Sequence, residues 1–471
     1  MPLILGTNSI KDTGYDVANS ARFNSASSDN LSKTFSSNGT RTKWTLSMWV
    51  KRSKLGAENS LSGVYIDGNN EDALRFNSDD TLSFIDFRSG GYGSGGRLVT
   101  NRLFRDVSSW YNLIFRWDTG DSTADNRMKI WVNGVEETSF AQRNNPSTNT
   151  ESLFNSTTAW IYGAKGNSSA SFLDGYMAEV VFCDNQKLEP TSFGEFDEDS
   201  GIWKPKDVSG LTFGTNGFYL DFEDSSALGN DVSGNNNDFT ANNLTAIDQS
   251  TDTCTNNFAT GNPLDNGCGK APTFSEGNLK YVSASTFNFA LPTIGVSSGK
   301  WYMEIKFVAL GEGGSIMAGI TDQFDNTNRD LTGNAFAGGE PLGIGYYQNG
   351  NKYLNNVASS YGSTYTTGDI IGVYLDVDNS KLYFAKNGTL QNSGTGLDLP
   401  SSANSTGVFF FMPSVDKATI EVNYGNPTFT GTDKADANGY GSFEYDPSVG
   451  TFDGASKDFY ALNTKNLAEF G

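Results

Sequence analysis

Short runs in which apolar and polar residues alternate constrain the fold of this chain more than any other feature. The clearest runs are WTLSMWVKR, residues 44–52, and GKWYMEIKF, residues 299–307. A period of two places every second side chain on the same face of a β-strand. Turn sequences separate these runs, and no stretch of twelve or more residues has helical periodicity. The sequence therefore predicts an all-β fold built of antiparallel sandwiches.

Two similar sequence segments lie far apart in the chain. They are DNRMKIWVNG, residues 125–134, and DNSKLYFAKNG, residues 378–388. Each combines a charged turn, an alternating run and an Asn-Gly pair, which readily takes the positive φ angles of a tight hairpin. We expect hairpins at comparable places in two sandwich domains. Hairpins of this sequence pattern also arise independently, so the two segments alone do not establish a domain duplication.

Composition excludes several classes of function. The net charge of −21 disfavours binding to a nucleic-acid backbone. The chain contains no histidine, which excludes Ser-His-Asp and Cys-His nucleophiles and every histidine-ligated metal site. No run approaches the ~20 apolar residues that cross a membrane, and the N-terminus lacks the features of a signal peptide. We therefore expect a protein made in the cytoplasm, without membrane insertion.

The 471 residues suffice for roughly two to four domains. Cys254 and Cys268 could close a loop, whereas the odd number of cysteines, with Cys183, favours reduced thiols. We predict two tandem β-sandwich (jelly-roll) domains joined by a polar linker. The predicted boundaries are an N-terminal arm at 1–21, a sandwich at 22–247, a linker at 248–277, a second sandwich at 278–430 and a C-terminal extension at 431–471.

The first block resembles the laminin-G branch of the concanavalin A-like fold. The resemblance is carried, in order, by WTLSMWVKR (44–52), WYNLIFRWD (110–118), KIWVNG (129–134) and LDGYMAEVVF (173–182). It implies a Ca²⁺-bridged carbohydrate site. The available hard ligands are Asp118, Asp121, Asp125 and Asp174. The alternative is that these are ordinary turn aspartates, which stabilise turns through their own backbone.

The second block resembles a SPRY domain. Its residues are SGKWYMEIKF (298–307), GDIIGVYLDVDNSKLYFAKNG (368–388) and ATIEVNYG (418–425). SPRY ligands dock on loops between strands, which implies a surface at residues 323–334 and 346–356. The candidate ligand-binding side chains are Arg329, Tyr346, Tyr347 and Tyr353. The alternative is that the tyrosines are half-buried strand residues.

The chain as a whole resembles structural proteins of marine tailed bacteriophages. This likeness is carried by LILGTNSIKDTGYDVANS (3–20), SGNNNDFTANN (233–243), TDTCTNNFATGNPL (251–264) and ALNTKNL (461–467). It implies a tail or head fibre on the virion exterior that contacts other virion proteins and binds host-surface glycans. A homo-oligomer, by analogy with fibre proteins a trimer, is expected. The alternative within this class is a capsid decoration protein with no host ligand.

An enzymatic alternative rests on closely spaced carboxylates. Glu195, Asp197 and Asp199 lie two residues apart, and on a strand they would share one face. A glycosidase needs two carboxyl groups at a defined separation. Asp221 and Glu223 form a second pair with the same spacing. Glycines and a proline surround the first set, so we predict a non-enzymatic binding protein, with a polysaccharide depolymerase as the alternative.

Overall fold

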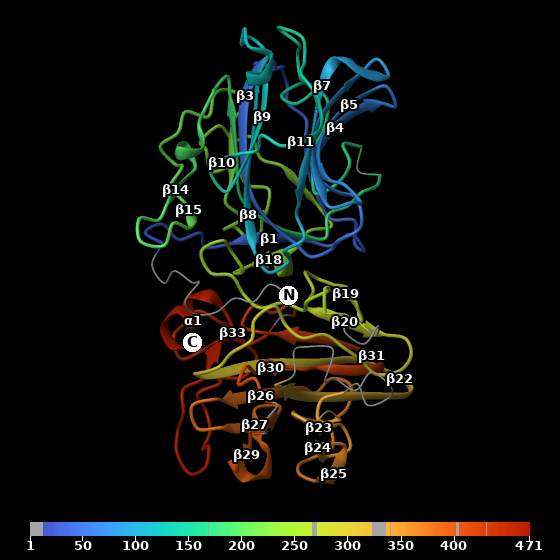
Figure 1. Ribbon diagram of the computed structural model, residues 1–471, viewed down its shortest axis with the longest axis vertical. Coiled ribbons are helices and arrows are strands. Elements are labelled where there is room, and N and C mark those ends of the chain that lie inside the picture. The colour runs from blue at the N-terminus through green and yellow to red at the C-terminus, as the bar shows by residue number, and fades with distance from the viewer. Residues whose placement is uncertain are drawn as a thin grey trace. The chain divides into compact units, whose positions relative to one another are not determined.

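The computed structural model describes residues 13–167, 169–265, 271–322, 336–339, 341–401, 405–429 and 431–471. Within them strands dominate, and the α-helical structure consists of α1 (Thr464–Phe470), so the all-β prediction is confirmed. This helix is too short to cross a membrane. The chain forms two compact units and passes from the first to the second after Thr255 (Figure 1).

Two antiparallel sheets form the first unit. One contains, in spatial order, β10 (Val135–Glu136), β9 (Met128–Val132), β8 (Trp110–Asp118), β3 (Lys43–Arg52), β13 (Gly175–Asp184), β1 (Ser20–Phe23) and β18 (Gln249–Ser250), with β16 (Phe218–Leu220) paired to β13. The other contains β11 (Phe140–Asn144), β7 (Gly91–Leu103), β6 (Thr81–Arg88), β5 (Asn70–Phe76), β4 (Asn59–Asp67), β12 (Trp160–Tyr162), β2 (Asn30–Lys33) and β17 (Thr240–Asn242). A short hairpin of β14 (Gly194–Phe196) and β15 (Trp203–Pro205) stands apart from both.

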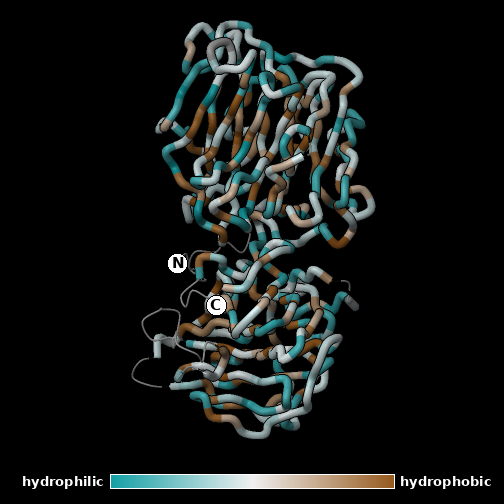
Figure 2. The backbone as a smooth tube through the Cα atoms, turned by 90° about the vertical axis from the view of Figure 1, so that its right-hand side faces the viewer, coloured by the Kyte–Doolittle hydropathy of each residue, from teal (hydrophilic) through white to brown (hydrophobic). Residues whose placement is uncertain are grey.

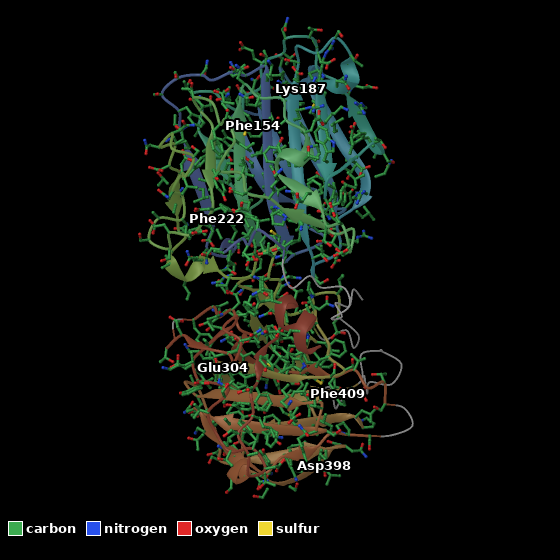
Figure 3. The ribbon with its side chains drawn as sticks, turned by 90° about the vertical axis from the view of Figure 1, so that its left-hand side faces the viewer. Phe154, Lys187, Phe222, Glu304, Asp398 and Phe409 are labelled. Carbon is green, nitrogen blue, oxygen red and sulfur yellow. The ribbon has the colours of Figure 1, made fainter. Side chains whose placement is uncertain are left out.

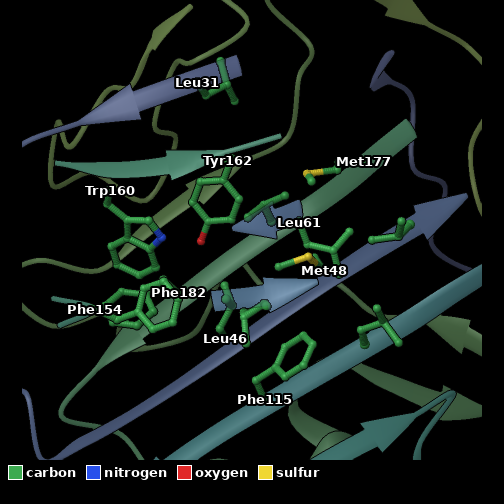
Figure 4. Close-up of a cluster of buried hydrophobic side chains, with 14 of the residues drawn as sticks. Leu31, Leu46, Met48, Leu61, Phe115, Phe154, Trp160, Tyr162, Met177 and Phe182 are labelled. Atoms are coloured by element: carbon green, nitrogen blue, oxygen red, sulfur yellow. The ribbon is translucent and has the colours of Figure 1, made fainter. Parts of the chain in front are cut away.

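The core of the first unit lies between these sheets. The predicted apolar face of residues 44–52 is buried in it, at Trp44, Leu46, Met48 and Val50. Aromatic rings fill much of the space, and the Trp160 ring lies 4.8 Å from that of Phe182 and 5.0 Å from that of Phe154 (Figure 4). Along the strands of both units, hydrophobic positions recur between hydrophilic ones, as Figure 2 shows. The alternation thus decides which side chains meet in the core.

The opposite face of β3 is also buried, although the alternation predicts a half-buried strand. Trp49 lies in a second cluster with Val17, Trp110, Tyr176 and Trp203. This cluster draws on the segment before β1 and on the β14–β15 hairpin. Because those segments cover the outer face of the sheet, β3 is buried on both sides.

The second unit is one extended sheet that folds over its own core. Its strands are β19 (Thr273–Ser275), β20 (Lys280–Ser283), β21 (Asn288–Phe289), β22 (Lys300–Thr321), β23 (Gly343–Tyr347), β24 (Asn351–Leu354), β25 (Val357–Ser360), β26 (Ile370–Asp376), β27 (Lys381–Lys386), β28 (Thr389–Leu390), β29 (Leu397–Asp398), β30 (Phe410–Phe411), β31 (Ser414–Asn423) and β34 (Tyr460–Ala461). A separate pair joins β32 (Lys434–Ala435) to β33 (Ser442–Phe443). In the large sheet, the central strand β22 pairs with both β26 and β31.

Both Asn-Gly corners adopt the predicted geometry. Asn133 and Gly134 have φ angles of 49° and 77°, and Asn387 and Gly388 have 48° and 75°. Consecutive positive φ angles are those of a type I′ turn. The first corner joins β9 to β10 and the second joins β27 to β28. The two similar sequence segments therefore form hairpins, one in each unit.

The segment predicted as a linker, residues 248–277, is divided between the two units. In the first unit, β18 pairs with β1. In the second, the Ala259 N–H donates to the Leu462 carbonyl at 2.9 Å. Hydrogen bonding to each unit thus continues up to the boundary at residue 255. Of the predicted arm, residues 1–12 lie outside the described residues, whereas Val17 packs in the cluster around Trp49.

The predicted C-terminal extension packs on the second unit. Phe443, Phe452 and Phe459 are buried in a cluster with Tyr302 and Tyr374 of the main sheet. The buried carboxylate of Glu304, labelled in Figure 3, accepts hydrogen bonds from the N–H groups of residues 444 and 445 at 3.0 and 2.8 Å. These contacts make the extension an integral layer of this unit.

Candidate functional site

Two of the four predicted Ca²⁺ ligands lie together, and a lysine lies between them. The Lys187 ammonium is 2.9 Å from a carboxylate oxygen of Asp118 and 2.9 Å from one of Asp121. Its hydrogen bond lowers the pKa of Asp121 to about 2. The three side chains line a hollow of about 430 Å³ with Lys43 and Ser122. Lys187, labelled in Figure 3, therefore neutralises the two carboxylates with which it pairs.

The other two predicted ligands lie elsewhere. Asp125 accepts a hydrogen bond from Asn145 at 2.6 Å and pairs with Arg143 at 3.3 Å. Asp174 accepts hydrogen bonds from Ser25 and pairs with Lys54. Among the described residues no three metal-binding side chains gather at one point. Because Ca²⁺ takes six to eight oxygen ligands, these residues do not fit the predicted site.

Tyr346, predicted to contact a ligand, is instead a core residue. It is fully buried, and its ring lies 5.0 Å from that of Tyr365 and 5.4 Å from that of Phe384. Its hydroxyl donates to the carbonyl of Ser363. Burial raises the pKa of this hydroxyl above its ordinary value. The ring therefore packs the second sandwich and offers no surface to a ligand.

Tyr347 and Tyr353 do lie together near the surface. They are partly exposed on neighbouring strands β23 and β24, with ring centroids 5.8 Å apart and nearly perpendicular. The Tyr347 hydroxyl is 2.8 Å from that of Ser315, and Tyr353 packs edge-on to Phe336. Arg329 lies outside the described residues. Two of the four predicted residues thus form an aromatic pair on this unit.

The carboxylates of the enzymatic alternative are engaged in a turn. Asp197 accepts hydrogen bonds from the backbone and hydroxyl of Ser200 at 2.9 and 2.8 Å, which lower its pKa to about 2. Lys204 lies 3.6 Å from Glu195 and 3.3 Å from Asp197. Asp199 is exposed in the same turn. A general acid needs a raised pKa, whereas the hydrogen bonds to Asp197 lower its pKa.

The second acidic pair has a different environment. Burial raises the pKa of Asp221, and its carboxylate accepts a hydrogen bond from the N–H of Glu223 at 3.1 Å. The Glu223 side chain is exposed. The two-residue separation in the sequence therefore brings the backbone N–H of Glu223, and not its carboxyl group, to Asp221.

A polar groove that the sequence analysis missed lies on the outer face of the first sandwich. It has a volume of about 390 Å³ and is lined by Asn30, Ser32, Ala159, Ile161, Gly166, Asn167 and Asn242. Strand register brings these residues together, because Ser32 stands opposite both Ile161 and Thr240, and Asn30 opposite Asn242. The run of asparagines at residues 235–243 was a visible signal, but only the register of β17 against β2 joins it to Asn30.

Amides and a hydroxyl surround an apolar floor in this groove. The Asn242 amide donates to the side-chain oxygens of Asn30 and Ser32, both at 3.0 Å. Ile161 provides the floor and is only 4% exposed. Gly166 closes one side, and a Cβ there would lie 2.6 Å from the backbone nitrogen of Tyr65. The close approach requires glycine and holds Asn167 at the rim.

Further polar atoms lie on the same outward face of this sheet. Register places Gly63, Ala73 and Ile85 in a row with Ile161. Because alternate residues of a strand share a face, Glu71 and Arg75 project on the same side as Ala73. Within the described part of the chain, Glu71 Oε1, Arg75 Nε and Arg97 Nε are buried without a hydrogen-bond partner. Buried polar atoms are normally satisfied, so these three atoms are exceptions on this face.

Two parts of the chain match the profiles of known domain families. Residues 24–190 match the concanavalin A-like lectin/glucanases superfamily, and residues 300–427 match the SPRY domain. The matched ranges fall within the two sandwiches, which confirms the resemblance of each block. Both kinds of domain commonly mediate binding to carbohydrates or proteins, so a binding role is supported.

Relatives share only part of this chain. The ATP-dependent RNA helicase DDX1 of Xenopus laevis is 31% identical over 137 residues, 29% of this chain and 17% of that protein. The Ran-binding proteins 9/10 homolog of Drosophila melanogaster is 30% identical over 111 residues, 23% of this chain and 11% of that protein. The chain thus matches a small fraction of the length of these curated relatives.

Parts of this chain also match solved structures. A putative carbohydrate binding protein from Bacteroides ovatus has a TM-score of 0.35 and 13% identity, with 48% of this chain and 59% of that chain covered. The SPRY domain of human HERC1 has a TM-score of 0.23 and 18% identity, with 30% of this chain and 85% of that chain covered.

Proposed function

We propose that this chain is a non-enzymatic binding protein whose first sandwich holds a glycan in the groove lined by Asn30, Ser32 and Asn242. The groove itself carries the proposal. Sugar rings present hydroxyl groups at their edge and C–H groups on their face. Amide and hydroxyl groups around an apolar isoleucine match that pattern, since ligand sites combine an apolar lining with a few well-placed polar groups.

A single groove of this size is suited to weak binding of one sugar unit. A dissociation constant of about 1 mM corresponds to only about 4 kcal/mol. Several copies on one particle would raise the effective affinity by orders of magnitude, because later binding events become intramolecular. The function therefore depends on display of many copies.

The proposed setting is the exterior of a bacteriophage particle, after synthesis in the bacterial cytoplasm. The resemblance of the chain's opening, central and closing segments to phage structural proteins supports this setting. The proposed partners are host-surface glycans, neighbouring virion proteins and further copies of the chain in a trimer. The second sandwich would contact a neighbouring protein through the aromatic pair Tyr347 and Tyr353, because interfaces are enriched in tyrosine.

The first experiment measures depletion of purified, labelled full-length protein from solution by intact cells of candidate marine hosts. We expect saturable depletion that extracted surface polysaccharide competes away. Replacement of Ala159 by Trp fills the groove. Asn242→Ala removes an amide oxygen that would accept a hydrogen bond from a sugar hydroxyl, weakening each site about tenfold for about 1.4 kcal/mol.

The matched control is Asn101→Ala. Asn101 is exposed on the same sandwich, and its amide donates to Ser139 at 2.9 Å, outside the groove. Depletion that survives Ala159→Trp would contradict the groove as the binding site. No depletion by any host would contradict glycan binding at the cell surface and favour a decoration protein.

A further inference from the structure

An ion pair between a lysine and an aspartate is buried on the outer face of β3, beside the cluster around Trp49. The Lys51 Nζ atom lies 2.6 Å from Asp252 Oδ2, and the two side chains are 1% and 0% exposed. Lys51 is near the end of β3, and Asp252 follows β18, the last strand of the unit. The pair therefore connects segments 201 residues apart in the chain.

Aromatic side chains surround the pair. The strands on either side of β3 place Trp110 and Tyr176 directly opposite Lys51. The lysine Nζ atom lies 5.8 Å from the centre of the Tyr176 ring, and the two aromatic rings are 6.2 Å apart. These neighbours keep water from the ammonium group. Such burial is costly for separate charges, because the desolvation of both ions can exceed their attraction.

Hydrogen bonds to its backbone and its carboxyl group hold Asp252 in place. The Trp110 indole N–H donates to Asp252 Oδ1 at 3.1 Å. The Asp252 N–H donates to Ser250 Oγ at 3.0 Å, and the Ser20 hydroxyl donates to the Asp252 carbonyl at 2.7 Å. Since Lys51 is held within a strand paired on both sides, the nitrogen and the carboxyl group stay close together. Proximity of this kind greatly favours reaction between two groups.

From this arrangement we infer that Lys51 and Asp252 form an intramolecular isopeptide bond. The ammonium first passes one proton to the carboxylate, which gives a neutral amine and a neutral acid. The amine nitrogen then attacks Asp252 Cγ, and the bond between Cγ and Oδ2 breaks. The departing oxygen leaves as water with both protons that the ammonium nitrogen loses. An ammonium and a carboxylate thus become an amide and water, without oxidation or a co-reactant.

The surroundings favour each part of this reaction. Burial lowers the pKa of Lys51, which promotes the neutral amine. A desolvated lysine is an activated nucleophile. The Trp110 N–H points at the oxygen on which negative charge develops during attack, as the donors of an oxyanion hole do. The product carries no charge, so its formation removes two ions from a dry interior.

Lys457 and Asp376 in the second unit provide a matched comparison. Their separation is 2.7 Å, but the lysine side chain keeps 14% exposure. Asp376 also accepts hydrogen bonds from Asn379, and Lys457 donates to the Tyr383 hydroxyl at 2.8 Å. Because the Lys457 side chain keeps contact with water, this pair remains an ordinary ion pair.

Mass spectrometry of the denatured full chain tests the inference. We expect an intact mass lower than the sequence mass by one water molecule. A tryptic digest should contain a branched peptide that joins Lys51 to Asp252, and no cleavage after Lys51. Lys457 should be cleaved normally. An intact wild-type mass equal to the sequence mass, together with a free peptide ending at Lys51, would overturn the proposal and leave a buried ion pair.

The variant Lys51→Arg keeps the positive charge and cannot form the amide. It should therefore have the full sequence mass. Since the wild-type mass decides the question, the inference stays testable even if this variant folds poorly. A mass deficit that persists in Lys51→Arg would place the lost water elsewhere and would also overturn the assignment.

Discussion

Replacement of Phe452 by alanine tests whether the C-terminal extension is part of the second sandwich. Phe452 is fully buried, and its ring lies 5.0 Å from Tyr374, 5.1 Å from Tyr383 and 4.9 Å from Phe459. Two of these partners belong to the main sheet and one to the extension. Truncation of a buried phenylalanine costs about 3–5 kcal/mol through lost transfer energy and the cavity that remains.

The loss is large compared with the stability of a single domain, which is about 5–15 kcal/mol. With a urea dependence of about 1–3 kcal/mol per molar, the unfolding midpoint should fall by more than roughly 1 M. Amide hydrogen exchange followed by mass spectrometry, over a range of urea concentrations, reads the second unit separately through peptides of β26 and β27.

Val449→Ala is the matched control, because Val449 lies in the same segment and is 63% exposed. Its effect should stay within about 0.5 kcal/mol. If Phe452→Ala shifts the exchange of β26 and β27 no more than Val449→Ala does, the extension does not stabilise this sandwich. The packing argument would then be refuted.

Three further predictions concern the first sandwich. Burial raises the pKa of Glu179 from 4.5 to about 7, so the folded state holds this proton more tightly than the unfolded chain. This contribution is fully present below pH 4.5 and is lost as the pH rises through 7. The free energy of unfolding should fall by about 3 kcal/mol across that window, and urea titrations of Glu179→Gln should lack this part of the fall. Gly134→Ala should destabilise by more than about 1 kcal/mol, because its φ is 77° and the new Cβ would lie 2.3 Å from Trp203; thermal unfolding measures this. Added Ca²⁺ should leave the wild-type melting temperature unchanged, since Lys187 already neutralises Asp118 and Asp121. A rise of several degrees in the melting temperature would contradict that account.

Local patterns predicted the strands and corners because their causes are local. Alternation placed Trp44 and Leu46 in the core, and the Asn-Gly pairs turned at the expected positions. In β23, whose sequence is GIGYY, no such contrast between the two faces exists, so the pattern could not say which tyrosine turns inward. Tyr346 and Tyr347 are adjacent and point to opposite faces, so one is buried and the other is partly exposed. A shift of one residue exchanges the two faces of a strand.

The proposed glycan groove and the predicted metal site depended on contacts that are distant in the chain. Lys187 lies 66 residues from Asp121, so the acidic loop alone gave no sign of the cation that neutralises it. Asn242 meets Asn30 across 212 residues through the pairing of β17 with β2. Strand pairing of this range follows from the whole fold and is invisible in local composition.

Glycan binding in the groove is tested most directly by saturation-transfer NMR with oligosaccharides from a host surface polysaccharide. The proposal predicts transfer from the full-length wild-type protein to the sugar protons. This transfer should disappear in Ala159→Trp and persist in Asn101→Ala. Transfer of equal strength in Ala159→Trp, or its absence from the wild type at millimolar sugar, would contradict the central claim.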